Sequence, residues 1–95
     1  MAKFKFSKLT ENGGMKLLKG WGEKGDAMQA HLSDRDAFLL ILKGEIDFRL
    51  GTKTLPLATD DFMEIPAQEV HAFEVRKSCE LLLVLDREAN MTFVE

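Results

Sequence analysis

The sequence has only one cysteine, Cys79, and no apolar segment long enough to span a membrane. A lone cysteine cannot form an internal disulfide or a cysteine metal site, and it is typical of a reducing compartment. The longest apolar runs, residues 37–42 and 81–85, are far shorter than the ~20 residues that a spanning helix needs. Residues 3–6 alternate lysine with phenylalanine, where a signal peptide would have an apolar block. We therefore expect a soluble, cytoplasmic protein with no membrane partner.

An excess of positive charge is also missing, because 13 basic residues stand against 16 acidic ones. Binding to nucleic acid depends largely on such an excess, so no nucleic-acid partner is expected. The charge is uneven: residues 1–24 carry six lysines and two glutamates, net +4, and residues 25–95 carry seven basic and fourteen acidic residues, net −7. Either the basic segment docks on the acidic remainder of its own chain or of a partner, or it is a solvated lysine face.

Helical periodicity is absent as well, since no window of a dozen residues keeps apolar side chains at helical spacing without interruption. Strict alternation of polar and apolar residues recurs instead, at residues 3–6, 45–50 and 71–76, and it predicts strands. Turn signals separate the strands, among them Asn12-Gly13, Gly20-Trp21-Gly22 and Lys43-Gly44. Many short strands in one domain of 95 residues predict an all-β sandwich or barrel.

Two predicted strands, residues 37–42 and 81–85, are apolar on both faces. Such strands need cover on both sides of the sheet. One face lines the interior of the barrel, and a second copy of the chain is the simplest cover for the other face. We therefore expect a homodimer, with the N-terminal strand, residues 3–9, as the element that crosses to the partner.

The only two histidines, His31 and His71, lie in segments that resemble the two motifs of a small single-domain cupin, an RmlC-like jelly-roll barrel. Five residues separate Gly25 from His31, and Gly44 follows thirteen residues after His31, as in the first cupin motif. Pro66 and His71 match the second motif. The resemblance covers residues 25–44 and about 60–75. It implies that residues 1–95 form one cupin-type β-barrel, a double-stranded β-helix.

The chain departs from the cupin pattern at the metal ligands. Ser33 stands where the family has its second histidine, and Ala37 where it has its glutamate. The resemblance therefore implies that only His31 and His71 remain of four ligands. A divalent transition metal such as Zn, Ni, Mn or Fe would then bind weakly or not at all. Three further positions of the second motif also differ, namely Asp60, Gln68 and Val75.

Two imidazoles fall short of the three protein ligands that a catalytic first-row metal site generally has. Asp34, Asp36 or Gln29 could fill the gap, but both aspartates are also suited to bonding backbone N–H groups of the turn. Three interpretations of His31 and His71 stay open: a metal site, a metal-free pocket for a small molecule, or a structural pair of imidazoles.

Alternation along the strands predicts which side chains face the interior. Gln29, His31 and Ser33 share one face of their strand, Leu39 and Ile41 face inward if Ala37 does, and His71, Phe73 and Val75 share another wall. A mostly apolar cavity with a few polar groups suits a small organic ligand with one or two oxygen atoms. The predicted ligand-binding residues are Gln29, His31, Ser33, His71 and Phe73. The same apolar side chains also suit a plain packed core.

Other chemistry-bearing residues receive structural interpretations. Trp21, between two glycines, is expected in a turn, either as a lid that caps the barrel or as an anchor of an interface. Cys79 is expected to be an inert, partly buried thiol. No phosphate-binding loop and no nucleophile elbow occurs in the sequence.

The sequence therefore predicts a small-molecule-binding protein of cupin fold with a degenerate metal site, and it leaves catalysis open. One alternative is a metal-dependent cupin enzyme, a dioxygenase or a sugar or keto-acid isomerase. A second alternative is a non-catalytic dimeric interaction or sensor module. The ligand, the metal and the pathway are not specified by the sequence, because fold does not fix function.

Overall fold

The computed structural model describes residues 4–94, which form eight strands. The strands are β1 (Lys5–Asn12), β2 (Met15–Gly22), β3 (Ala27–Ser33), β4 (Ala37–Leu50), β5 (Lys53–Ala58), β6 (Phe62–Ile65), β7 (His71–Asp86) and β8 (Met91–Phe93). Within these residues no helix is present that could cross a membrane. The all-β prediction is confirmed.

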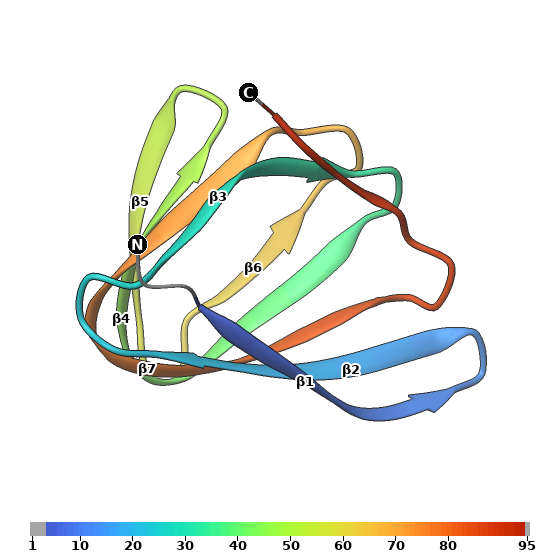
Figure 1. Ribbon diagram of the computed structural model, residues 1–95, viewed down its shortest axis with the longest axis horizontal. Coiled ribbons are helices and arrows are strands. Elements are labelled where there is room, and N and C mark those ends of the chain that lie inside the picture. The colour runs from blue at the N-terminus through green and yellow to red at the C-terminus, as the bar shows by residue number, and fades with distance from the viewer. Residues whose placement is uncertain (1–3, 95) are drawn as a thin grey trace.

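Two long strands, β4 and β7, organise the fold, and Figure 1 shows the sheet curling around an interior. They pair antiparallel along nearly their whole length, from Ala37 opposite Leu85 to Leu50 opposite His71. One layer contains β1, β2, the second half of β7, the first half of β4, and β6. The facing layer contains β8, β3, the first half of β7, the second half of β4, and β5. This curled, two-layered sheet is the predicted cupin-type barrel.

Gly44 forms the corner at which β4 passes from one layer to the other. The predicted turn at Lys43-Gly44 is wrong, because the strand continues through it with irregular pairing to β7. Gly44 has a φ of +88°, and a Cβ atom there would overlap the carbonyl oxygen of Ser78. The irregularity also changes which residues face inward, from Leu39 and Ile41 before the corner to Ile46 and Phe48 after it.

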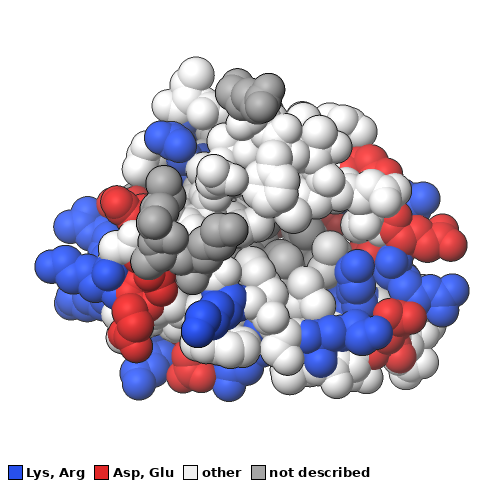
Figure 2. Space-filling view, in the orientation of Figure 1, with Lys and Arg blue, Asp and Glu red and all other residues white. Residues whose placement is uncertain are grey.

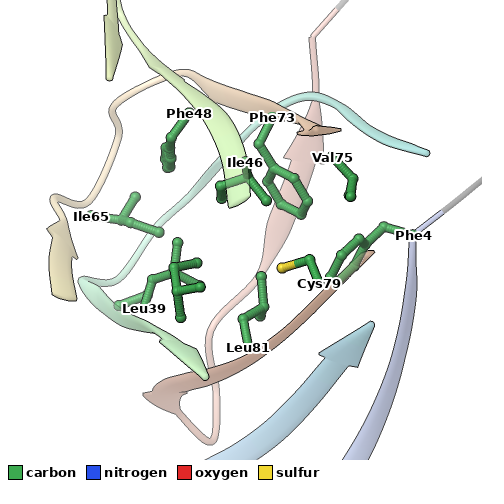
Figure 3. Packing of buried hydrophobic residues seen from close by; sticks show 11 residues of the cluster. Phe4, Leu39, Ile46, Phe48, Ile65, Phe73, Val75, Cys79 and Leu81 are labelled. Atoms are coloured by element: carbon green, nitrogen blue, oxygen red, sulfur yellow. The ribbon is translucent and has the colours of Figure 1, made fainter. Parts of the chain in front are cut away.

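Side chains from both long strands pack together between the layers, as Figure 3 shows. Phe73 and Val75 of β7 are almost completely buried, and so are Leu39 and Ile41 of β4. The predicted inward orientation of these four residues is confirmed. Phe4 completes the core from the N-terminal side, where its ring meets that of Phe73 edge to face at a centroid distance of 4.9 Å.

The N-terminal segment lies against its own chain. Phe4 packs in the core directly over Gly20 and Gly22 of β2, where any Cβ atom would meet the phenylalanine ring. This packing explains the two glycines without a turn, because β2 runs straight through them. The crossing of residues 3–9 to a partner stays a prediction, and Lys3 lies outside the described residues. Trp21 points outward and is 41% exposed, so its prediction as a lid in a turn is wrong.

The first hairpin forms near the predicted position. β1 and β2 close at the pair Asn12 and Met15, and both loop residues, Gly13 and Gly14, have positive φ. The turn is therefore centred one residue later than Asn12-Gly13. Such a two-residue loop matches the right-handed twist of the flanking strands.

The N-terminal lysines do not form a uniform basic face. Lys19 pairs with Glu80 of β7 at 2.9 Å, and Lys8 pairs with Glu11 within β1 at 3.2 Å. Near the hairpin end, basic and acidic side chains lie together (Figure 2). Exposed pairs of this kind contribute only ~0–1 kcal/mol each. Both sequence interpretations thus hold in part, since Lys19 docks on the acidic remainder of the chain, whereas Lys5 and Lys24 are exposed and Lys8 pairs locally.

Candidate functional site

The two histidines contact each other inside the barrel. His31 of β3 lies directly opposite His71 of β7 in the antiparallel ladder. Their ring centroids are 4.1 Å apart with an interplanar angle of 63°, and each residue is 7% exposed. The prediction that the two histidines meet in one interior is confirmed.

Each imidazole is held by a backbone carbonyl two residues earlier in the chain. The Nδ1–H of His31 donates to the carbonyl oxygen of Gln29 at 2.6 Å, and the Nδ1–H of His71 donates to that of Glu69 at 3.0 Å. Because a carbonyl oxygen can only accept, the proton of each neutral ring must sit on Nδ1. Each Nε2 atom then carries a lone pair and remains available as an acceptor.

Both histidines favour the neutral form. Burial lowers the pKa of His31 below its ordinary value, and the bond to the Gln29 carbonyl opposes this effect. Burial likewise lowers the pKa of His71, the bond to Glu69 opposes it, and the neighbouring His31 lowers the pKa further. Near neutral pH the pair therefore presents two uncharged hydrogen-bond acceptors.

An apolar cavity of about 230 Å³ lies beside the histidine pair. Leucine, isoleucine, phenylalanine and methionine side chains from both layers line it, among them Leu39, Leu83 and Leu85. Phe73 also lines it, as predicted. Mostly apolar walls with a few polar groups are typical of pockets for small organic molecules.

Lys16 of β2 is the only charged side chain among the described residues that line this cavity. It is half-buried and lies opposite Leu85 of β7, which also faces the cavity. Sequence reasoning missed Lys16. The signal was present, because Lys16 is two residues before Leu18 and four before Gly20, both on the inward face of β2.

The prediction that Gln29 faces the cavity is wrong. The pairing of β3 with β7 shifts between Met28 and His31, and this irregularity turns Met28 rather than Gln29 toward the histidines. The side chain of Gln29 is exposed and lines a separate hollow of about 430 Å³ that also includes Arg49. Its contribution to the histidine site is the backbone carbonyl that holds His31.

Ser33 also differs from its prediction, because it is not among the residues that line the cavity. Its hydroxyl oxygen accepts a hydrogen bond from the backbone N–H of Arg35 at 3.2 Å. The side chain is therefore engaged at the end of β3, where it stabilises the turn that follows. A ligand-binding role for Ser33 has no support from this geometry.

The residues present do not fit a first-row transition metal. Ala37, at the position of the missing glutamate, is 6% exposed and brings no donor atom to the interior. Asp34 and Asp36 accept backbone N–H groups, as expected, but from the remote residues Asn90 and Ala67. Within residues 4–94, no three histidine, cysteine or acidic side chains are grouped so that they could hold a metal ion. Two imidazoles alone fall short of a stable site.

Cys79 lies elsewhere in the core and is 3% exposed. Burial raises the pKa of its thiol to about 11, and the negative charge of Glu80 contributes to the increase. Because the thiolate is the reactive form, this cysteine is inert near neutral pH, which agrees with its prediction.

Comparison with protein families gives one match, to the family described as "Cupin domain", over residues 22–85. The matched segment includes both histidines, the Gly44 corner and most of β7. No curated protein matches the sequence.

Solved structures with the same architecture are numerous. A cupin 2 domain-containing protein from Halorhodospira halophila has a TM-score of 0.91 at 13% identity, covering 98% of this chain and 71% of that chain. An RmlC-like cupin from Shewanella frigidimarina has a TM-score of 0.83 at 19% identity, covering 93% of this chain and 81% of that chain. The polyketide cyclase RemF from Streptomyces resistomycificus has a TM-score of 0.88 at 18% identity, covering 98% of this chain and 72% of that chain. At such identities the likeness shows the fold alone.

Proposed function

The chain belongs to the cupin domain family, and we propose that it is a small-molecule-binding member with a degenerate metal site. One observation carries this proposal: two neutral imidazoles, each held through Nδ1 by a backbone carbonyl, line an apolar cavity of about 230 Å³. With its proton on Nδ1, each ring can only accept a hydrogen bond at Nε2. A bound molecule with a hydrogen-bond donor can supply the partner for such an acceptor.

The competing interpretation as a structural pair explains less of the geometry. Two backbone carbonyls already satisfy the Nδ1 atoms of His31 and His71, and a purely structural role needs nothing more from the rings. The space beside them would then be expected to be filled, because protein interiors are close-packed. A cavity of this size next to two acceptors favours a ligand.

The alternative of a metal-dependent enzyme needs a third protein ligand. Ala37 cannot supply one, and Asp34 and Asp36 are held by backbone N–H groups of other segments. The proposed function therefore includes binding and no metal-assisted reaction.

A fragment screen by NMR tests the proposal, with the methyl groups of Leu39, Leu83 and Leu85 as reporters of the cavity. We expect small neutral and anionic fragments to shift these signals. Leu83→Trp should fill the cavity and abolish the shifts. Leu9→Trp, on a leucine that is 54% exposed on β1, is the matched control and should leave them unchanged. A screen without hits, or equal binding to the Leu83→Trp variant, would contradict the proposal.

We also propose that the protein is a homodimer formed through the outer face, defined as Phe38, Leu40, Leu42, Phe62, Leu82 and Val84. These side chains are adjacent across β6, β4 and β7. Phe62 is 63% exposed, and its ring stacks on that of Phe38 at a centroid distance of 5.7 Å. A contiguous apolar patch of this kind is typical of an interaction site.

The charges at the edges of the outer face favour a second copy as its partner. Glu64 lies on β6 at one edge, opposite Phe38, and Lys5 lies on β1 at the other edge, opposite Trp21. With a twofold axis parallel to the strands, each edge meets the opposite edge of the partner, so Glu64 of one copy lies on the side of Lys5 of the other. The apolar centre is buried in the same step.

A further inference from the structure

The charge of Lys16 has no partner among the residues that the structure describes. One candidate is Glu11, its cross-strand neighbour on β1. The carboxylate of Glu11 is instead engaged by Lys8 at 3.2 Å and by Arg87 at 3.8 Å. No acidic group of residues 4–94 forms an ion pair with Lys16. Lys16, a half-buried residue, thus lines an apolar cavity without a counter-ion among these residues.

Lys16 and the histidine pair belong to the two facing layers of the barrel. Lys16 lies beside Leu85, in the layer of β2 and the second half of β7. His31 and His71 lie in the layer of β3 and the first half of β7. All three side chains line the same cavity. A molecule that fills this cavity therefore lies between a basic residue of one layer and two hydrogen-bond acceptors of the other.

The histidine side and the Lys16 side of the cavity attract different chemical groups. The Nε2 lone pairs of His31 and His71 attract the O–H of a hydroxyl group and repel a carboxylate, whose oxygens only accept. The ammonium group of Lys16 attracts an anion, and a charge-assisted hydrogen bond at a partly buried site is stronger than a neutral one. The walls between them, such as Leu39 and Leu83, suit a carbon skeleton.

We infer that the cavity takes a small hydroxy acid, with its carboxylate at Lys16, its apolar body between the layers, and its hydroxyl group hydrogen-bonded to Nε2 of His31 or His71. This inference rests on the proposed function and specifies the ligand class of the same site. Two vicinal hydroxyl groups satisfy both histidines at once, so a dihydroxy acid should bind more tightly than a monohydroxy acid.

Titrations with matched aromatic acids test this assignment. The probes are protocatechuate, para-hydroxybenzoate and para-hydroxyphenylacetate, with benzoate and phenylacetate as counterparts without hydroxyl groups and the methyl esters as counterparts without charge. We expect at least one hydroxy acid to bind about tenfold more tightly than both of its counterparts, measured from the cavity methyl signals. Lys16→Met should remove the preference for acid over ester and keep the preference for the hydroxyl group.

Lys19→Met is the matched control, because Lys19 lies on the same strand and its exposed side chain pairs with Glu80 outside the cavity. This variant should keep both preferences. If an ester binds as tightly as its acid, or if Lys16→Met leaves their ratio unchanged, the inference is overturned and the proposed function stands, since the ester still occupies the cavity. If no probe shifts the cavity signals, the inference is likewise overturned, and the wider fragment screen alone decides the proposed function.

Discussion

The imidazole rings of His31 and His71 meet edge to face at directly paired positions of β3 and β7, with their centroids 4.1 Å apart. A proton added to one ring places a positive charge against the other, which disfavours protonation of both. The two rings therefore titrate as a coupled pair, and their apparent pKa values belong to the pair. Their shared neutral state underlies both the proposed function and the pH dependence of stability.

The first prediction concerns that pH dependence. Burial lowers the pKa of both histidines in the folded protein, whereas the unfolded chain keeps the ordinary value of 6.5. Below that value the unfolded state binds more protons than the folded state. The free energy of unfolding should therefore fall as the pH drops from about 7.5 to about 5, and should level off below the lowered pKa values. Urea unfolding across this range measures it.

A double variant, His31→Gln with His71→Gln, should lose this slope between pH 7.5 and 5. The carboxylates of Asp34 and Glu80 affect the free energy of unfolding at lower pH than the histidines do. The hydrogen bonds from Asn90 lower the pKa of Asp34, and that from Lys19 lowers the pKa of Glu80. Their contribution to stability is present above the ordinary values of 3.8 and 4.5 and is lost as the pH falls below them. An unchanged slope in the double variant would show that the histidines are not its cause.

The second prediction concerns the Gly44 corner. Gly44→Ala should lower the free energy of unfolding by about 2–4 kcal/mol, because alanine resists positive φ and its Cβ would overlap the Ser78 carbonyl. Gly13→Ala is the control. Gly13 also has positive φ, at +60°, but nothing lies within 4 Å of its Cβ position. The Gly13→Ala variant should therefore lose only about 1 kcal/mol of its free energy of unfolding. Equal losses would mean that the close approach to Ser78 contributes nothing.

The sequence predicted well the features that depend on regular alternation. Leu39, Ile41 and Phe73 face the interior as their spacing indicates, and the same periodicity brought His31 and His71 together. Within a regular strand, side chains alternate strictly between the two faces, so one correctly placed residue fixes its neighbours. The resemblance to cupin motifs supplied that first placement.

The failures occur where pairing is irregular or where remote residues intervene. The shift between Met28 and His31 moved Gln29 to the opposite face, and the sequence carries no glycine or proline there to signal it. Trp21 was misplaced because its flanking glycines leave room for the ring of Phe4, which is distant in the sequence. Contacts of this kind depend on tertiary packing, which local patterns do not contain.

The third prediction concerns assembly. The wild-type chain should sediment as a dimer at micromolar concentration, and Leu40→Lys should sediment as a monomer, because a charge at the centre of the outer face must be desolvated in the dimer. Leu9→Lys introduces the same charge at a leucine that is 54% exposed on β1 and should remain dimeric. A monomeric wild-type protein, or equal behaviour of the two variants, would contradict the proposed interface.

The fourth prediction concerns metal affinity. The unmodified chain should bind Ni²⁺, Zn²⁺ and Mn²⁺ weakly, because it offers two imidazoles and no anionic ligand. Ser33→His combined with Ala37→Glu should restore the four donors of the family pattern. Ala37 lies on the inward face of β4, and Ser33 is two residues from His31 and opposite Met91, which lines the cavity. Calorimetry should show an increase in affinity of about 100-fold or more.

A matched variant, Ser33→His with Ala37→Gln, keeps the size of the new side chain and removes its charge. It should regain only part of the metal affinity, because a neutral amide is a weaker ligand for a dication. Adding His31→Ala to the restored variant should abolish tight binding. If the unmodified chain instead binds metal with submicromolar affinity, and if His31→Ala and His71→Ala each remove it, then two histidines suffice here. The site would not be degenerate, and the metal-dependent enzyme would become the better interpretation.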